Sequence, residues 1–209
     1  MIDTQTYYLF LLTALVLVLS PGPDMALILS RTLARGRGAG IMTLLGTQTG
    51  IMLHALLAGL GVSSVILLLP QAFEILKYIG AAYLVYLAVV TWRASATIDL
   101  DGKLKNCDGN ALRYFYQGLV NNLFNPKMIP FFIALFPQFI RTEGGSVALQ
   151  SVLLGATLVG IAIVWLGALV LLVGRIRTAV ASSASFLKLA NRLSALAFVG
   201  LACLVFVER

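Results

Sequence analysis

Two proline-containing segments interrupt apolar stretches of this chain, and they constrain its fold more than any other feature. The first is residues 20–24 (SPGPD), and the second is residues 121–127 (NNLFNPK). Proline lacks a backbone N–H and clashes with the preceding turn, so a helix must open at each segment. Asp24 and Lys127 add an ionisable residue at each break, which within a membrane indicates function. Two broken helices in corresponding positions are typical of secondary transporters.

The composition is that of a multi-pass membrane protein. Of the 209 residues, 60% are hydrophobic and only 11% are charged. The start of the chain lacks the basic region of a cleaved signal peptide, so we expect the first helix to be retained. The net charge of +7 suits cytoplasmic loops, and the scattered basic residues argue against nucleic-acid binding.

Six segments approach the roughly 20 apolar residues that a spanning helix needs. The sequence predicts helices at residues 7–33, 39–69, 73–92, 116–140, 147–174 and 193–207. Phe186, Leu187 and Leu189 are expected to extend the last one as an amphipathic turn. The fold class is therefore all-α and membrane-spanning, with one transporter domain over residues 1–209. Its halves, residues 1–93 and 114–209, are joined by a polar loop at 93–113.

The basic residues predict that both termini lie outside and that the 93–113 loop is cytoplasmic. This orientation places 11 Lys and Arg residues in cytoplasmic loops and 3 outside, with Lys127 within the membrane. Both halves begin with a proline-broken span followed by a long glycine-containing helix. Because each half has three spans, the second must be inverted relative to the first, with spans one and four broken at proline.

At the first break, Gly22 is expected as the N-cap and Pro23 as the first residue of an inner half-helix, after the opening at Pro21. Asp24 then falls in the first turn, where the helix dipole favours a carboxylate. Asp24 is a candidate substrate ligand or proton carrier, and a plain helix cap is the alternative.

At the second break, Asn125 is expected as an N-cap and Pro126 as the first residue of a half-helix that ends at Phe139. Its free amides and Lys127 would form an anion site suited to a carboxylate, with Asn121 nearby. The alternative is that Lys127 extends to the cytoplasmic interface.

A zwitterionic substrate would use both breaks. We expect its carboxylate at Lys127 and the amides after Asn125, and its ammonium at Asp24 or at carbonyls near Val18 and Leu19. In the empty protein, Asp24 is expected either to pair with Lys127 or to take a proton.

Residues 46–54 add two further motifs. His54 is a candidate proton relay because its reference pKa is near neutrality, although a bonded packing role is the alternative. His54 has no partner at metal-ligand spacing, so no metal site is expected. Gly46 and Gly50 form a GxxxG pair that favours close helix packing over a dimer or sliding seam.

These motifs resemble those of the LysE/RhtB family of amino-acid exporters. The similar residues are the 20–24 segment, Gly46, Gly50 and His54, residues 80–84 (GAAYL), residues 125–127 (NPK) and residues 136–139 (FPQF). The resemblance implies a six-helix protein of the cytoplasmic (inner) membrane. It also implies proton-coupled export of amino acids or close derivatives, of the homoserine, threonine or lysine type.

Two other functions compete with export. A thiol–disulfide carrier needs paired intramembrane cysteines, whereas Cys107 and Cys203 fall in a polar loop and in the last helix. A non-transporting scaffold has little reason to place charges and prolines at mid-depth. No Walker-type phosphate loop is present in the sequence, and we expect neither an enzyme nor a cofactor. The expected partners are the amino acid, protons and lipid, and a homo-oligomer is left open.

Overall fold

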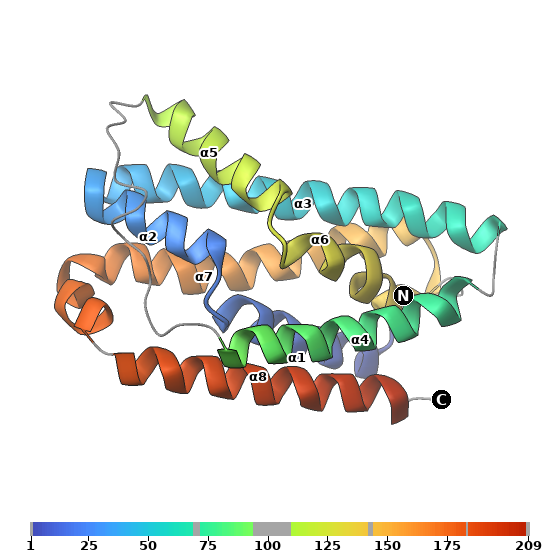
Figure 1. Ribbon diagram of the computed structural model, residues 1–209. Helices are drawn as coiled ribbons and strands as arrows, with labels where there is room; N and C mark the ends of the chain where they lie inside the picture. The colour runs from blue at the N-terminus through green and yellow to red at the C-terminus, as the bar shows by residue number, and fades with distance from the viewer. Residues whose placement is uncertain (1, 69–71, 94–109, 142–143, 183, 208–209) are drawn as a thin grey trace.

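The computed structural model describes residues 2–68, 72–93, 110–141, 144–182 and 184–207, and every regular element within them is helical (Figure 1). The elements are α1 (Thr4–Leu19), α2 (Pro23–Arg35), α3 (Arg37–Leu68), α4 (Ala72–Arg93), α5 (Ala111–Leu123), α6 (Met128–Pro130), the π-helix η1 (Phe131–Leu135), the 3-10 helix η2 (Phe136–Phe139), α7 (Val147–Ser182) and α8 (Ala184–Val207). Cys107 and most of the expected 93–113 loop lie outside the described residues.

Two helical segments in the described part of the chain are long and apolar enough to cross a membrane alone. They are Arg37–Gly61 of α3 and Val147–Leu172 of α7. Two bent pairs also qualify if each is one span: α1 with α2, and α5 with the segment Met128–Phe139. The described parts of α4 and α8 contain shorter apolar helices, Tyr78–Arg93 and Asn191–Cys203. Up to four spans are therefore supported by length and composition, and six remains a prediction.

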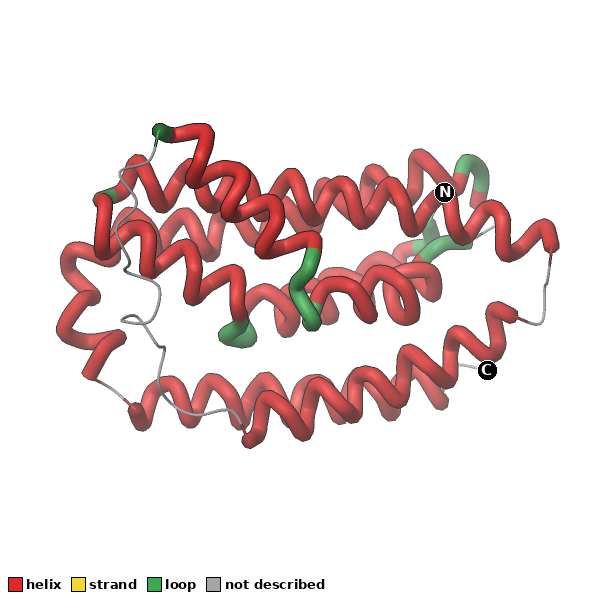
Figure 2. Tube along the Cα trace, turned by 45° about the horizontal axis from the view of Figure 1, so that its top comes forward, coloured by secondary structure: helices red, strands yellow, loops and turns green. Residues whose placement is uncertain are grey.

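Both expected breaks are present, and both lie part-way along the bundle. The chain bends by 48° between α1 and α2, and by 59° between α5 and the segment after it. In Figure 2 the two connecting segments lie in the middle part of the bundle, away from its ends. The N- and C-termini lie at the same end of the bundle (Figure 1), opposite the turn at Gly36 that joins α2 to α3.

Several expected boundaries were wrong. Helix α7 continues to Ser182, beyond the expected end at residue 174, and α8 begins at Ala184, before the expected start at residue 193. Helix α5 begins at Ala111, after Asn110 in the N-cap position, so Arg113 belongs to the helix and not to the preceding loop. The half-helix after the second break is not a regular α-helix from Pro126 to Phe139. It comprises three short elements of α, π and 3-10 type. Pro130 and Pro137 explain this irregularity, because neither can donate the N–H of a regular helical hydrogen bond.

Helices α3 and α5 pack closely because glycines remove the side chains between them. A Cβ at Gly46 would overlap the Phe115 carbonyl, and a Cβ at Gly50 would lie 2.5 Å from the Asn122 side chain. From α5, a Cβ at Gly118 would overlap the Thr43 carbonyl. Within the described residues, the GxxxG pair thus lies at a contact inside the chain, which brings α3 against the second break.

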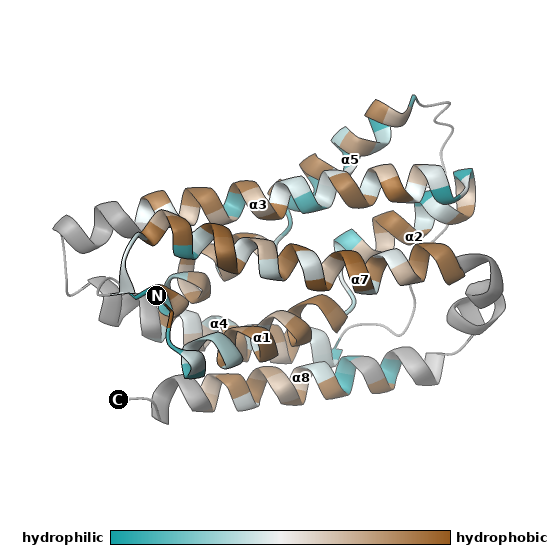
Figure 3. Ribbon diagram, turned by 180° about the vertical axis from the view of Figure 1, so that it is seen from behind, coloured by the Kyte–Doolittle hydropathy of each residue, from teal (hydrophilic) through white to brown (hydrophobic). Residues whose placement is uncertain are grey.

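Apolar side chains fill the space between the helices and also cover much of the outer surface. Phe10, Phe131 and Phe136 are fully buried, whereas Leu57 of α3 and Val164 of α7 are 62% and 74% exposed. Figure 3 shows hydrophobic residues along the sides of α1 and α7, and hydrophilic residues part-way along α3. An apolar exterior of this kind is suited to lipid.

At the end of the bundle that holds the N-terminus, α1 is tied to the chain before α7. The Arg141 guanidinium lies 3.4 Å from the Asp3 carboxylate and donates to the Thr6 hydroxyl at 3.1 Å. Asp3 caps α1 by accepting the Thr6 N–H at 2.9 Å. These hydrogen bonds from Thr6, and then the Arg141 charge, hold the pKa of Asp3 below its ordinary value of 3.8.

Candidate functional site

The Asp24 carboxylate of the first break is bound by asparagines of the second break. Asn121 donates to one carboxylate oxygen and Asn122 to the other, each at 2.7 Å. The Asn125 side chain also interacts with this carboxylate. Asp24 is 8% exposed and Asn122 is fully buried, so these charge-assisted hydrogen bonds are shielded from solvent.

The ammonium of Lys127, at the second break, is bound by carbonyls of the first break. Its Nζ donates to the Leu17 carbonyl at 2.5 Å and to the Ser20 carbonyl at 2.9 Å. The lysine side chain passes over Gly22, where an added Cβ would lie 3.6 Å from the lysine Cδ. Lys127 therefore points into the bundle and does not extend to the interface.

Each break thus binds the charged side chain of the other, whereas direct pairing of Asp24 with Lys127 was one of the two arrangements expected for the empty protein. In the described residues Asp24 and Lys127 form no ion pair with each other, and each bonds to uncharged groups of the opposite break. Gly22 is the N-cap of α2 and Pro23 its first residue, as expected. Asp24 lies in the first turn of α2, but its carboxylate accepts a hydrogen bond from Asn121 of α5, so it is not a plain helix cap.

The carbonyls that bind Lys127 are those of Leu17 and Ser20, which flank Val18 and Leu19, where carbonyls for a substrate ammonium were expected. Pro21 explains why the Leu17 carbonyl is available to accept from Lys127. In a continuous helix the Leu17 carbonyl would accept from the N–H of residue 21, and Pro21 has none. The Ser20 carbonyl is free because Ser20 lies outside both α1 and α2.

The backbone amides after Asn125 are already occupied, contrary to the anion site expected there. The Lys127 N–H donates to the Asn125 side chain at 2.9 Å. The N–H groups of Met128 and Ile129 donate to the Asn125 carbonyl at 3.0 and 3.1 Å. Pro126 has no N–H to offer. In this state, the groups of the second break that could meet a carboxylate are side chains.

His54 of α3 lies next to the second break. Its Nε2 is 3.4 Å from the Asn122 carbonyl, and its ring stacks on Phe132 with centroids 5.2 Å apart. Asn122 links this histidine to Asp24, because its backbone faces His54 while its side chain holds the carboxylate.

The main residue missing from the predicted site is Asn122. Its position beside Asn121 was visible in the sequence, but only the helical rotation of α5 shows that both side chains face Asp24. Tyr83 of α4 was also missed. Its hydroxyl donates to the Lys127 carbonyl at 2.6 Å. The sequence around a single tyrosine in an apolar helix does not indicate which group its hydroxyl will bind.

Some polar atoms at the site are buried without a hydrogen-bond partner among the described residues. They include the Ser20 hydroxyl and the Asn122 Oδ1. Buried polar groups are usually paired, so such atoms mark places where a ligand or water would be stabilised.

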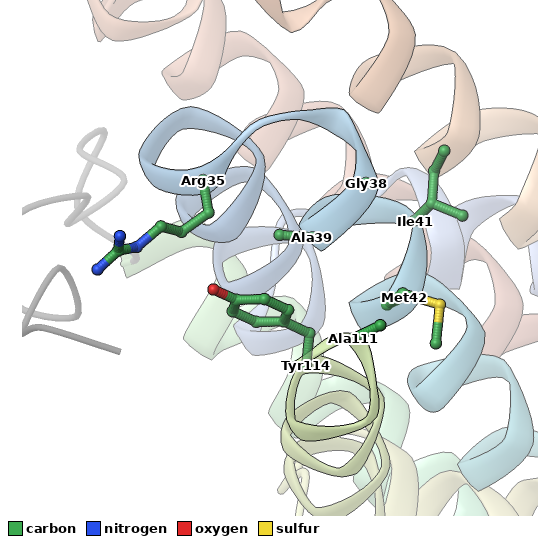
Figure 4. A pocket seen from close by; sticks show the side chains of 7 residues that line it. All are labelled: Arg35, Gly38, Ala39, Ile41, Met42, Ala111 and Tyr114. Atoms are coloured by element: carbon green, nitrogen blue, oxygen red, sulfur yellow. The ribbon is translucent and has the colours of Figure 1, made fainter. Parts of the chain in front are cut away.

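A separate pocket of about 710 Å³ lies at the opposite end of α2 (Figure 4). It is lined by Arg35, Gly38, Ala39, Ile41, Met42, Ala111 and Tyr114. In Figure 4 the Arg35 guanidinium points away from the Ile41 and Met42 side chains. None of the break residues lines this pocket, so it is not part of the candidate site.

The described residues include one cysteine and no cluster of potential metal ligands. No group of three or more His, Cys, Asp or Glu side chains is placed to hold a metal ion there. Cys203 is a free, exposed cysteine on α8.

Comparison with known proteins is consistent with this architecture. The family model described as LysE type translocator matches residues 15–209. The homoserine/homoserine lactone efflux protein of Salmonella typhimurium is 37% identical over 153 residues, covering 73% of each chain. The uncharacterized membrane protein YrhP of Bacillus subtilis is 35% identical over 159 residues, covering 73% of this chain and 75% of that one. No solved structure matches the chain.

Proposed function

Because this chain belongs to the LysE type translocator family, we propose that it is a secondary transporter that exports amino acids or close derivatives across the cytoplasmic membrane. The observation that supports the proposal is that each break binds the charged side chain of the other break. A carboxylate held by amides and an ammonium held by carbonyls are the two contacts that a zwitterion needs.

In the resting state the protein's own charges occupy these two subsites. An entering amino acid would place its ammonium at the Leu17 and Ser20 carbonyls and release Lys127, whose ammonium then binds the substrate carboxylate. Asn121 and Asn125 lie beside Asp24 and complete the site on the second break. The unpartnered Ser20 hydroxyl and Asn122 Oδ1 supply further polar contacts for the substrate.

Selectivity for zwitterions follows from this exchange. A molecule with an ammonium but no carboxylate would displace Lys127 from the Leu17 and Ser20 carbonyls and leave the lysine ammonium without a partner. Uncompensated charge in a low-dielectric interior is costly, so such a molecule binds more weakly. A substrate of the homoserine, threonine or lysine type satisfies both subsites.

Proton coupling is assigned to Asp24, with His54 as the relay. A carboxylate accepts from both Asn121 and Asn122, whereas a protonated carboxyl keeps less acceptor capacity. Protonation would therefore loosen the link between α2 and α5 and favour the change of access. His54 supports the relay role because it contacts the backbone of the residue that holds Asp24.

The proposed architecture is six spans in two inverted halves, with both termini outside the inner membrane. The pairing of α3 with α7 and of α4 with α8 supports it, since these are the equivalent helices of the two halves. The position of both chain ends at one end of the bundle also fits an even number of spans (Figure 1).

The test is efflux from cells preloaded with dipeptides, which release single amino acids inside the cell. Cells with the gene are expected to export at least one amino acid of a panel faster than cells without it, and a protonophore should slow this export. Lys127→Met provides the inactive control. Equal efflux of every panel member with the wild-type and Lys127→Met proteins would contradict the proposal.

A further inference from the structure

Three prolines of the broken spans, Pro21, Pro126 and Pro130, leave carbonyls without their helical donors, and side chains from other elements lie at those carbonyls. In an α-helix each carbonyl accepts from the N–H four residues later, so a proline removes the donor of the residue four positions earlier. Pro21 thereby removes the donor for Leu17, whose carbonyl accepts from Lys127. In a membrane such groups must be satisfied within the protein.

The second break follows the same rule. Pro126 removes the helical donor for the Asn122 carbonyl. The N–H of Asn125 meets that carbonyl at 3.0 Å, and His54 Nε2 lies 3.4 Å from it.

The third case lies beside the candidate site and has no role in the proposed function. Pro130 removes the helical donor for the Pro126 carbonyl. The Tyr83 hydroxyl of α4 lies 3.4 Å from this carbonyl and donates to the neighbouring Lys127 carbonyl at 2.6 Å. Tyr83 is 7% exposed, so this hydrogen bond is protected from solvent.

We infer that Tyr83 is a positioning residue: its hydroxyl fixes the main chain of Lys127, so that the lysine ammonium reaches the first break. Lys127 is then held at both ends, by Tyr83 at its carbonyl and by Leu17 and Ser20 at its ammonium. The consequence for export rests on the proposed function, whereas the anchoring of the second break does not.

The packing of α4 against η1 places Tyr83 in register with Lys127. A Cβ at Gly80 would lie 2.8 Å from the Ala134 carbonyl and would overlap the Gln138 side chain, so glycine permits this close approach. Tyr83 lies three residues later, close to one helical turn along the same face. A π-helix such as η1 often marks a functional site in a helix, so an anchor at Lys127, four residues before η1 begins, would control how this segment moves.

The test compares Tyr83→Phe with Tyr86→Phe in the full-length protein. Tyr86 is the matched control, because it is 56% exposed on the same helix and its ring stacks on Tyr83 with centroids 6.0 Å apart. Both substitutions remove one oxygen and keep the ring. In purified protein, Tyr83→Phe is expected to speed hydrogen–deuterium exchange of the 127–135 segment about tenfold, and Tyr86→Phe to leave it unchanged.

Export provides the second measurement, with L-homoserine as the probe and rates normalised to protein in the membrane. Tyr83→Phe is expected to raise the KM by about threefold to tenfold, the usual effect of one lost hydrogen bond between uncharged groups. In the Lys127→Met background, Tyr83→Phe should have no further effect on homoserine binding, because it acts through Lys127.

A rescue variant separates anchoring from general packing. Pro130→Ala restores the N–H that the Pro126 carbonyl lacks, so Tyr83→Phe with Pro130→Ala should exchange more slowly and export better than Tyr83→Phe alone. Unchanged exchange in Tyr83→Phe, or equal effects of Tyr83→Phe and Tyr86→Phe, would overturn the inference. If exchange responds as expected but the wild-type protein exports no amino acid, the proposed function fails and the anchor stands.

Discussion

The ammonium nitrogen of Lys127 lies 2.9 Å from the carbonyl oxygen of Ser20, which joins two breaks that are 107 residues apart in the sequence. A positive charge bound to main-chain carbonyls is stabilised without a counter-ion beside it. The same carbonyls are a ready site for another ammonium group. Lys127 therefore joins the two halves, and under the proposed function a substrate ammonium replaces it at these carbonyls.

Lys127→Met is expected to reduce export at least 100-fold with normal membrane insertion. Methionine keeps much of the side-chain volume but removes the charge, so Leu17 and Ser20 lose their donor and the substrate carboxylate loses its partner. Efflux normalised to protein level measures the effect. Lys188→Met, at an exposed position on α8, is the control and should export at the wild-type rate.

Pro21→Ala is expected to lower export about tenfold. Alanine supplies the N–H that can bond to the Leu17 carbonyl, which then competes with Lys127 for this acceptor. Pro23→Ala is the matched control. Pro23 is the first residue of α2, where a missing N–H costs little, so its replacement should have a smaller effect. Equal losses in both variants would show that the prolines act by bending the chain and not by freeing Leu17.

Much of this fold follows from hydrophobic length and proline position. The starts of α3, α4 and α7 fall within two residues of the predicted boundaries, because long apolar runs and polar flanks leave few alternatives. The role of Gly22 and Pro23 was also predictable from capping preferences. The sequence also locates one unpaired carbonyl. Because Pro21 has no N–H, the carbonyl four residues earlier, that of Leu17, has no helical donor.

The partners across the site were not predictable in the same way. Asp24 could have faced Lys127, water or its own helix, and the choice of Asn122 depends on how α5 rotates against α3 at Gly50. The irregular turns after Met128 result from two prolines and from packing on α4, a tertiary effect that local propensity does not report.

Both termini are expected outside, because the basic residues concentrate in the loops at the other end. In a protein that retains only Cys107, an impermeant thiol reagent should fail to label intact cells and should label them after permeabilisation. Thr4→Cys in a cysteine-free protein should be labelled in intact cells. Labelling of Cys107 in intact cells would show that the protein has the opposite orientation.

The ion pair between Asp3 and Arg141 should make the free energy of unfolding depend on pH in the acidic range. The pKa of Asp3 is lowered in the folded protein, so its ionised form contributes stability above the ordinary value of 3.8 and this contribution is lost as pH falls through the lower folded value. Asp3→Ala is expected to cost about 1 kcal/mol at pH 7, as is usual for a lost N-cap. Thermal unfolding of the purified protein should show this difference at neutral pH and a smaller one below pH of about 4. A difference that stays constant from pH 7 to pH 3 would assign the loss to packing.

The link between Asp24 and Asn122 is best tested by a double-mutant cycle. Asp24→Asn removes the charge that both asparagines bind, and Asn122→Ala removes one of the two amide donors at 2.7 Å. Each single change is expected to raise the KM for L-homoserine about 10-fold to 100-fold, the range for hydrogen bonds to a charged group. Because both changes disrupt the same contact, the double variant should be no worse than the stronger single variant, which corresponds to a coupling of at least about 1 kcal/mol. Asn191→Ala on α8 supplies the control pair, whose effect should add to that of Asp24→Asn. Additive effects for Asn122→Ala as well would show that Asp24 and Asn122 do not act on the substrate as a unit.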